Sequence, residues 1–157
     1  MRIIFCTVSH FKKTVLEACV FLLQKKIELL AYSLREISES MENETKSSVG
    51  DKHETARARM QFEQEKLKHQ LLELKEQANE LQRIDLSAKP VQLGFGTLVT
   101  TNKGLFFISI PLGKIEVEEK EIYVISLSSP LGQALKSKVL TESLRFNGSD
   151  YQILGLD

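Results

Sequence analysis

The feature of this sequence that most constrains its fold is a heptad stripe of apolar residues in the first third of the chain. Successive members are spaced 4, 3, 4, 3, 4, 3 and 4 residues apart, a spacing that keeps them on one face of an α-helix. They are Leu16, Val20, Leu23, Ile27, Leu30, Leu34, Ile37 and Met41. The pattern predicts a long helix that packs along another helix in a coiled coil.

A second stripe with the same spacing of four and three residues follows and predicts the partner helix. Its core members are Leu67, Leu71, Leu74, Ala78 and Leu81, and Ala56 and Met60 extend it, with Gln64 as a polar interruption. The polar segment 42–51 between the stripes contains Gly50 and favours a chain reversal. We therefore expect an antiparallel helical hairpin whose second helix, over about 53–81, is roughly 40 to 45 Å long. The same seam is also compatible with an intermolecular coiled coil.

Glycine and proline divide the chain into two parts. All three prolines and seven of the eight glycines lie beyond residue 89, so we expect a domain boundary near 88–94. Short β-rich runs then alternate with turn residues, and Ser129 followed by Pro130 predicts the start of one short helix. The expected strands are 96–101, 105–110, 114–117, 121–127, 143–146 and 151–156. The predicted fold class is α+β, with a loose end over 1–10, a coiled-coil finger over 11–87 and a small sheet domain over 88–157.

Composition excludes several classes of function. The chain has 157 residues with 21 Lys and Arg against 21 Asp and Glu, so any charge-driven binding must be local. Its apolar runs, such as 18–23, are far shorter than the roughly 18 residues that cross a bilayer, and we expect no membrane association. Cys6 and Cys19 form no metal-binding spacing, which favours a reducing cytoplasm over a zinc site or a disulfide framework.

Two acidic residues mark the expected tip of the finger, at about 43–54. Asp51 and Glu54 stand three residues apart where the second helix should begin. As N-cap and third helical residue they would form a capping box, in which each side chain accepts a hydrogen bond from a free backbone NH. The same two carboxylates could instead converge on a hard cation such as Mg²⁺. The two interpretations are compatible, because a cap carboxylate has a second oxygen.

At this point the sequence resembles the Gre family of bacterial transcript cleavage factors. The tip reads GDKHETA and matches the Gly, Asp, Glu and Ala of the family's GDLxENAEY motif. The stretches FGTLVTTNKGLFFISIPLGKIEV and ISLSSPLGQALKSK are similar to the family's C-terminal domain. The resemblance covers most of the chain from about residue 12. It implies a coiled-coil finger followed by an FKBP-like domain, in a protein that binds core RNA polymerase. A monomer is the simplest expectation, and the oligomeric state stays open.

The resemblance also implies residue roles. The C-terminal domain would dock through Ser129, Pro130 and Leu131, and the finger would reach the polymerase active site through its secondary channel. There Asp51 and Glu54 would help the polymerase hold a second Mg²⁺ and cleave a backtracked transcript, so no stand-alone enzyme activity is expected. Basic residues near the tip would steer nascent RNA, or they are only a solvated helix end. These are Lys46, Lys52, Arg57 and Arg59.

Departures from the family pattern leave other functions open. The Asn and Tyr of the tip motif are replaced by Thr55 and by Arg57 or Ala58, and Ser128 stands where typical members are acidic. A factor that occupies the channel without promoting cleavage is therefore an alternative. A second alternative is a coiled-coil interaction module that does not bind polymerase.

Overall fold

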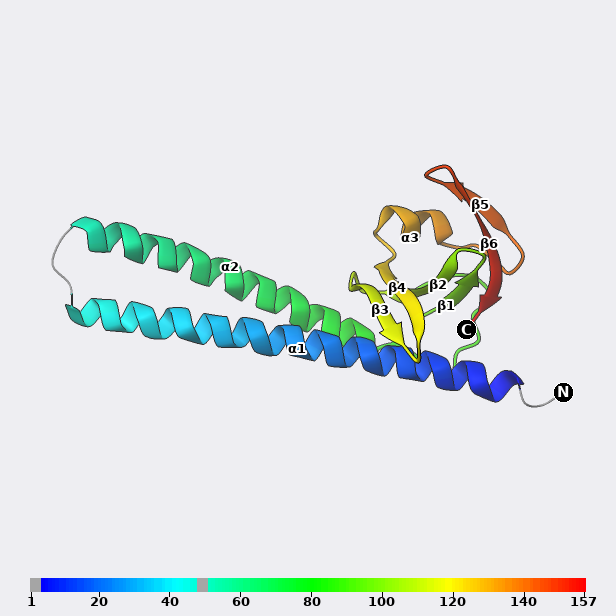
Figure 1. Cartoon of the computed structure of the whole chain (residues 1–157), viewed down its shortest axis with the longest axis horizontal. Helices are drawn as coiled ribbons and strands as arrows, with labels where there is room; N and C mark the ends of the chain where they lie inside the picture. Colours follow the sequence, from blue (N-terminus) through cyan, green and yellow to red (C-terminus); the bar gives the residue numbers. More distant parts are fainter. Residues whose placement is uncertain (1–3, 48–50) are drawn as a thin grey trace. The chain divides into compact units, whose positions relative to one another are not determined.

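The computed structural model describes residues 4–47 and 51–157, and within these ranges the side chains of 4–9, 45, 47, 51 and 52 lie outside the description. Two long helices precede a six-stranded mixed sheet and one short helix (Figure 1). The elements are α1 (Ile4–Ser47), α2 (Asp51–Gln82), β1 (Leu98–Thr101), β2 (Gly104–Ser109), β3 (Gly113–Val117), β4 (Lys120–Ser126), α3 (Pro130–Leu135), β5 (Ser143–Phe146) and β6 (Ser149–Leu156). The α+β prediction is confirmed.

The chain forms two compact units whose boundary differs from the predicted one. The hairpin unit is Leu22–Ala78, and the sheet unit combines Met1–Phe21 with Asn79–Asp157. The bases of both helices thus belong with the sheet rather than with the finger. Helix α1 also includes residues 4–10, so the predicted loose end is wrong for this stretch. This stretch contains no glycine or proline that would stop a helix.

Within the hairpin unit the two predicted stripes are the less exposed faces of α1 and α2. Leu23 and Leu67 are buried, and the following stripe members on both helices are half-buried. The amide Nε2 of Gln64 donates a hydrogen bond to Ser38 Oγ at 3.0 Å, so the polar interruption of one stripe has its partner on the other helix. A polar pair inside an apolar seam fixes the register of the two helices.

The first stripe shifts at the base of α1. Val20 is 46% exposed, so its predicted place in the seam is wrong, and Cys19 is fully buried instead. Lys12 and Val15 are buried with it, at the helical spacings of three and four residues. This part of α1 belongs to the sheet unit, where the helix must cover a different surface from the one it meets in the hairpin.

The sheet has the strand order β3-β4-β2-β1-β6-β5. Strands β2 and β4 are parallel and the other neighbours are antiparallel. Two tight turns close the outer hairpins, at Glu118-Glu119 and at Asn147-Gly148, and all four of these residues have positive φ. Such turns match the twist of the flanking strands, and the second was expected from its sequence.

Both faces of the sheet are covered. On one face α3 closes an apolar core (Figure 1). Its buried members are Leu93, Val99, Phe106, Ile108, Leu135 and Ile153. On the other face Leu98 and Phe107 are buried, and the first turns of α1 approach the strands there through Phe11. In the described ranges, no helix is both long enough and apolar enough to span a membrane.

Candidate functional site

The predicted tip acids lie in the first turn of α2. The helix begins at Asp51, two residues earlier than expected, and Glu54 is one turn further on and exposed to solvent. Positions three residues apart lie on the same face of a helix. Gly50 and the side chain of Asp51 are outside the described residues, so the predicted capping box is outside them too. Glu54 therefore offers a solvated carboxylate at the distal end of the hairpin unit.

Several basic residues lie close to Glu54 in the sequence. Lys46 is exposed in the last turn of α1, and Arg57 and Arg59 are exposed on α2 just beyond Glu54. The side chain of Lys52 is outside the described residues. Exposed guanidinium and ammonium groups can bind phosphate oxygens without desolvation of a buried charge. Among the residues that the structure describes, no cluster of three or more His, Cys, Asp or Glu side chains could hold a metal ion.

The predicted docking residues form the start of α3. Ser129 is the N-cap: its hydroxyl accepts a hydrogen bond from the Gly132 NH at 3.0 Å and donates one to the Ser126 carbonyl at 2.8 Å. Pro130 occupies the first helical position and is exposed, whereas Leu131 is half-buried against the core. The expected cap is confirmed. Of the three predicted residues, only Pro130 presents an exposed side chain.

A glycine lets this helix approach the sheet closely. A Cβ at Gly132 would lie 2.1 Å from the Ser126 carbonyl oxygen, at the end of β4. Real Cβ atoms do not come this near to backbone oxygen, so α3 can keep its position only with glycine there. The need for glycine at this position could not be predicted from the sequence, because the neighbouring residues do not reveal what a side chain would meet.

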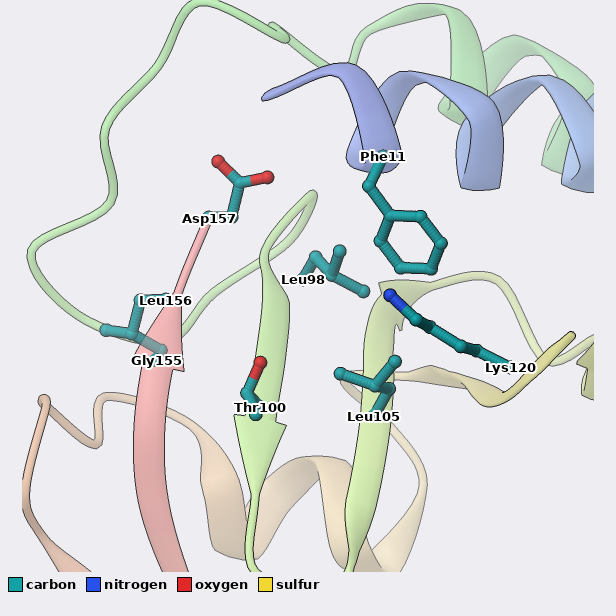
Figure 2. A pocket seen from close by; sticks show the side chains of 8 residues that line it. All are labelled: Phe11, Leu98, Thr100, Leu105, Lys120, Gly155, Leu156 and Asp157. Carbon is teal, nitrogen blue, oxygen red and sulfur yellow. The ribbon is translucent and has the colours of Figure 1, made fainter. Parts of the chain in front are cut away.

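The sheet unit also contains a cavity that sequence reasoning missed. Its volume is about 410 Å³, and it lies between the base of α1 and the strands β1, β2 and β6 (Figure 2). Leu98 and Leu105 form an apolar floor, and Phe11 lies across from them. The Lys120 ammonium stands 4.6 Å from the centre of the Phe11 ring, close enough for a cation–π interaction. This contact ties the turn between β3 and β4 to α1.

Beside the cavity lies a buried charge. Lys12 is only 2% exposed, and burial lowers its pKa, while the carboxylates of Asp157 and Asp85 raise it in part. Burial likewise raises the pKa of Asp157, partly offset by Lys12, and one Asp157 carboxylate oxygen is buried with no hydrogen-bond donor. Charged side chains from three separate segments of the chain, Lys12, Asp85 and Asp157, thus influence one another. The helical spacing of Lys12 with Val15 and Cys19 was the signal that could have revealed it.

The buried thiol does not fit a catalytic role. Burial raises the pKa of Cys19 to about 12, so the group is a neutral thiol at physiological pH. A nucleophilic cysteine needs a lowered pKa and access to substrate. Cys19 instead packs as a small apolar residue at the base of α1.

Comparisons with known proteins give limited similarity. No protein-family model matches the chain, and no curated protein matches it either. A search of solved structures finds similarity to a chain described as the structure of the transcription factor Gfh1, with a TM-score of 0.34 and 16% sequence identity. The alignment covers 87% of this chain and 92% of that chain. Similarity at this level does not assign a family or a function.

Proposed function

We propose that this chain is a transcription factor that binds RNA polymerase and inserts its helical hairpin into the secondary channel. The observation that carries the proposal is the exposed carboxylate of Glu54 in the first turn of α2, three residues after Asp51, at the end of a long helical hairpin. The part of α2 in the hairpin unit, residues 51–78, has 28 residues, which corresponds to about 42 Å at 1.5 Å per residue. A hairpin of this length can carry two acids deep into a channel.

The chemistry of the two acids fits a shared Mg²⁺ site. Carboxylate oxygens are the ligands that Mg²⁺ prefers, and Glu54 is free to rotate toward an external cation. A second metal bound between these acids and the polymerase would activate the attacking water and stabilise charge on the phosphate. Asp51 and Glu54 would orient that site, and the polymerase would hydrolyse the phosphodiester of a backtracked transcript. Two carboxylates alone bind Mg²⁺ weakly, so we propose no stand-alone nuclease activity.

The exposed cations near the tip would guide RNA. Arg57 and Arg59 follow Glu54 on α2, and Lys46 ends α1. Contacts of this kind attract phosphates without reading sequence, and their contribution weakens as salt rises. We propose that these residues, together with Lys52, hold the displaced 3′ end of the transcript beside the acids.

The sheet unit would dock on the polymerase through the start of α3. Pro130 is exposed there, and the cap formed by Ser129 holds it in one conformation. We propose that Pro130 contacts the polymerase directly, whereas Ser129 and Leu131 position it. This division predicts that Pro130→Ala weakens binding with little effect on stability, and that Ser129→Ala lowers both.

The decisive experiment is transcript cleavage in stalled, backtracked elongation complexes assembled with the cognate polymerase. The wild-type protein should stimulate cleavage, and Asp51→Ala/Glu54→Ala should lose that stimulation while it still binds polymerase. Glu65→Ala is the matched control, because it removes an exposed carboxylate from the shaft of α2. Failure of the wild type both to stimulate cleavage and to bind polymerase would overturn the proposal.

A second candidate function follows from the tip sequence. Thr55 stands where the family motif has Asn, and Arg57 or Ala58 where it has Tyr, so water positioning in the active site would differ. Such a protein would occupy the secondary channel and regulate the polymerase without cleavage. In the same experiment it would bind polymerase and compete with a known channel-binding factor, yet leave the transcript intact.

A further inference from the structure

One flank of the hairpin unit is hollowed by an open groove. It has a volume of about 380 Å³ and is bordered by both helices. Lys26, Leu29 and Leu30 of α1 face Gln70, Glu73 and Leu74 of α2 across it. The leucines make the groove mostly apolar. Leu30 and Leu74 belong to the seam and are half-buried, but Leu29 is 69% exposed and covers neither seam nor core.

The apolar surface continues along α1 beside the seam. Leu22 is 38% exposed and lies seven residues, or two turns, before Leu29. This spacing places both leucines on the same side of the helix. Single exposed leucines are common on protein surfaces. A periodic row beside a groove is different, because it presents the surface that another helix packs against.

The two walls of the groove carry opposite charges. Lys26 lies on the α1 wall and Glu73 on the α2 wall. The carboxylate oxygen Oε1 of Glu73 lies 3.4 Å from Nδ1 of His69 on the same helix. Among the ion pairs of the described residues, none includes Lys26. The groove therefore offers a cation on one side and an anion on the other, within about one helical turn of each other along the hairpin.

We propose that this flank is the interface between two copies of the chain. Consider a two-fold axis that runs along the groove, parallel to the helices. It places α1 of each copy on α2 of the other, so Lys26 of each copy meets Glu73 of the other copy. A two-fold axis that runs across the groove would instead place Lys26 on Lys26. The charges thus select the first arrangement, an antiparallel four-helix bundle of a kind that packs well.

The size of the patch limits the strength of association. From Leu22 to Leu29 the apolar row spans eight residues, or about 10 Å of helix. A row this short buries less surface than the roughly 1,200 Å² of stable complexes, so the dimer is weak and forms only at high concentration. The zero net charge of the chain does not oppose association. The observations behind the dimer do not rest on the proposed role at RNA polymerase, and only the monomer would have both flanks of its hairpin free to enter a channel.

Sedimentation equilibrium of the full chain, at concentrations up to the high micromolar range, tests the proposal. The wild type should show a monomer–dimer equilibrium. Lys26→Glu and Glu73→Lys should each weaken dimerisation by at least about tenfold, because each creates two like-charge pairs. The double variant Lys26→Glu/Glu73→Lys should return to within about threefold of wild type, because both attractive pairs are restored with reversed polarity.

Two further variants make the result specific. Leu29→Gln should reduce dimerisation and leave the helix content unchanged, because this side chain is 69% exposed in the monomer. Glu65→Lys is the matched charge control outside the groove, and it should have no effect. A wild-type protein that stays monomeric throughout the range would overturn the proposal. Loss of dimer in both single reversals without recovery in the double variant would overturn the assigned arrangement.

Discussion

Gly132 is a position where the sheet unit leaves no room for a side chain. The Cβ of an alanine there would meet the Ser126 carbonyl oxygen at 2.1 Å and the Ser129 hydroxyl at 2.9 Å. The first atom belongs to the backbone at the end of β4 and cannot rotate away. Gly132→Ala therefore forces α3 away from the strand, and it also disturbs the cap, because the Ser129 hydroxyl accepts from the Gly132 NH.

The magnitude follows from three contributions. Overpacking of a well-packed site destabilises by about 1 to 3 kcal/mol. Loss of an N-cap contact costs about 1 kcal/mol. Alanine recovers about 1 kcal/mol through its higher helix propensity. The net loss is about 2 kcal/mol in the free energy of unfolding, which for a chain of this size lowers Tm by roughly 4 to 8 °C.

Thermal and urea unfolding of the full chain measure this loss. Gly94→Ala is the matched control, because no described atom lies within 4 Å of its added Cβ and its φ is not positive. It should change the free energy of unfolding by less than about 0.5 kcal/mol. Equal stability of Gly132→Ala and Gly94→Ala would refute the steric argument. In the polymerase-binding assay, Gly132→Ala should also bind more weakly, because it displaces Pro130.

Three further predictions concern other parts of the chain. Glu118 and Glu119 both have positive φ, so Glu118→Asn/Glu119→Gly should raise the free energy of unfolding by about 1 to 2 kcal/mol in urea titrations; no gain would mean that the turn is unstrained. Burial raises the pKa of Cys19 to about 12, so as pH rises the thiol loses its proton in the unfolded chain before it does so in the folded one. The free energy of unfolding should therefore fall between about pH 9 and 12, and Cys19→Ala should make this fall less steep. Alkylation of Cys19 by iodoacetamide at neutral pH, followed by peptide mass spectrometry, should be slow in the native state and fast in urea. Ser38→Ala removes the oxygen to which the Gln64 amide Nε2 donates and should lower the free energy of unfolding by about 1 kcal/mol. Urea unfolding followed by far-UV circular dichroism measures this loss. Ser38→Ala/Gln64→Leu should restore the wild-type stability, because neither polar group is then left without a partner.

Much of the architecture could be predicted from local sequence. The heptad spacing from Leu23 to Met41 and its counterpart from Leu67 to Leu81 define two helices whose apolar faces match, because helical periodicity depends only on residues a few positions apart. The Ser129-Pro130 start of α3 and the Asn147-Gly148 turn were likewise readable, since caps and turns depend on the backbone preferences of single residues.

The candidate site was predictable only in part. The acids of the tip follow from a short motif at a helix start, and α2 does begin at Asp51. The surroundings of Pro130 could not be predicted from the sequence. The exposure of Pro130, the partial burial of Leu131 and the need for glycine at position 132 all depend on where α3 lies relative to β4.

The tertiary structure decided the features that join distant segments. Val20 fits the heptad better than Cys19, yet Cys19 is buried, because the base of α1 belongs to the sheet unit and not to the hairpin. Lys12 shares a helical face with Val15 and Cys19, but its charge alone favours the surface, and only the positions of Asp85 and Asp157 explain why it is buried. The parallel pairing of β2 with β4 is equally absent from any local pattern. Residues a few positions apart determine which face of each helix or strand is apolar. Which of these apolar faces pack against one another depends on contacts between segments far apart in the chain, and only the tertiary structure shows them.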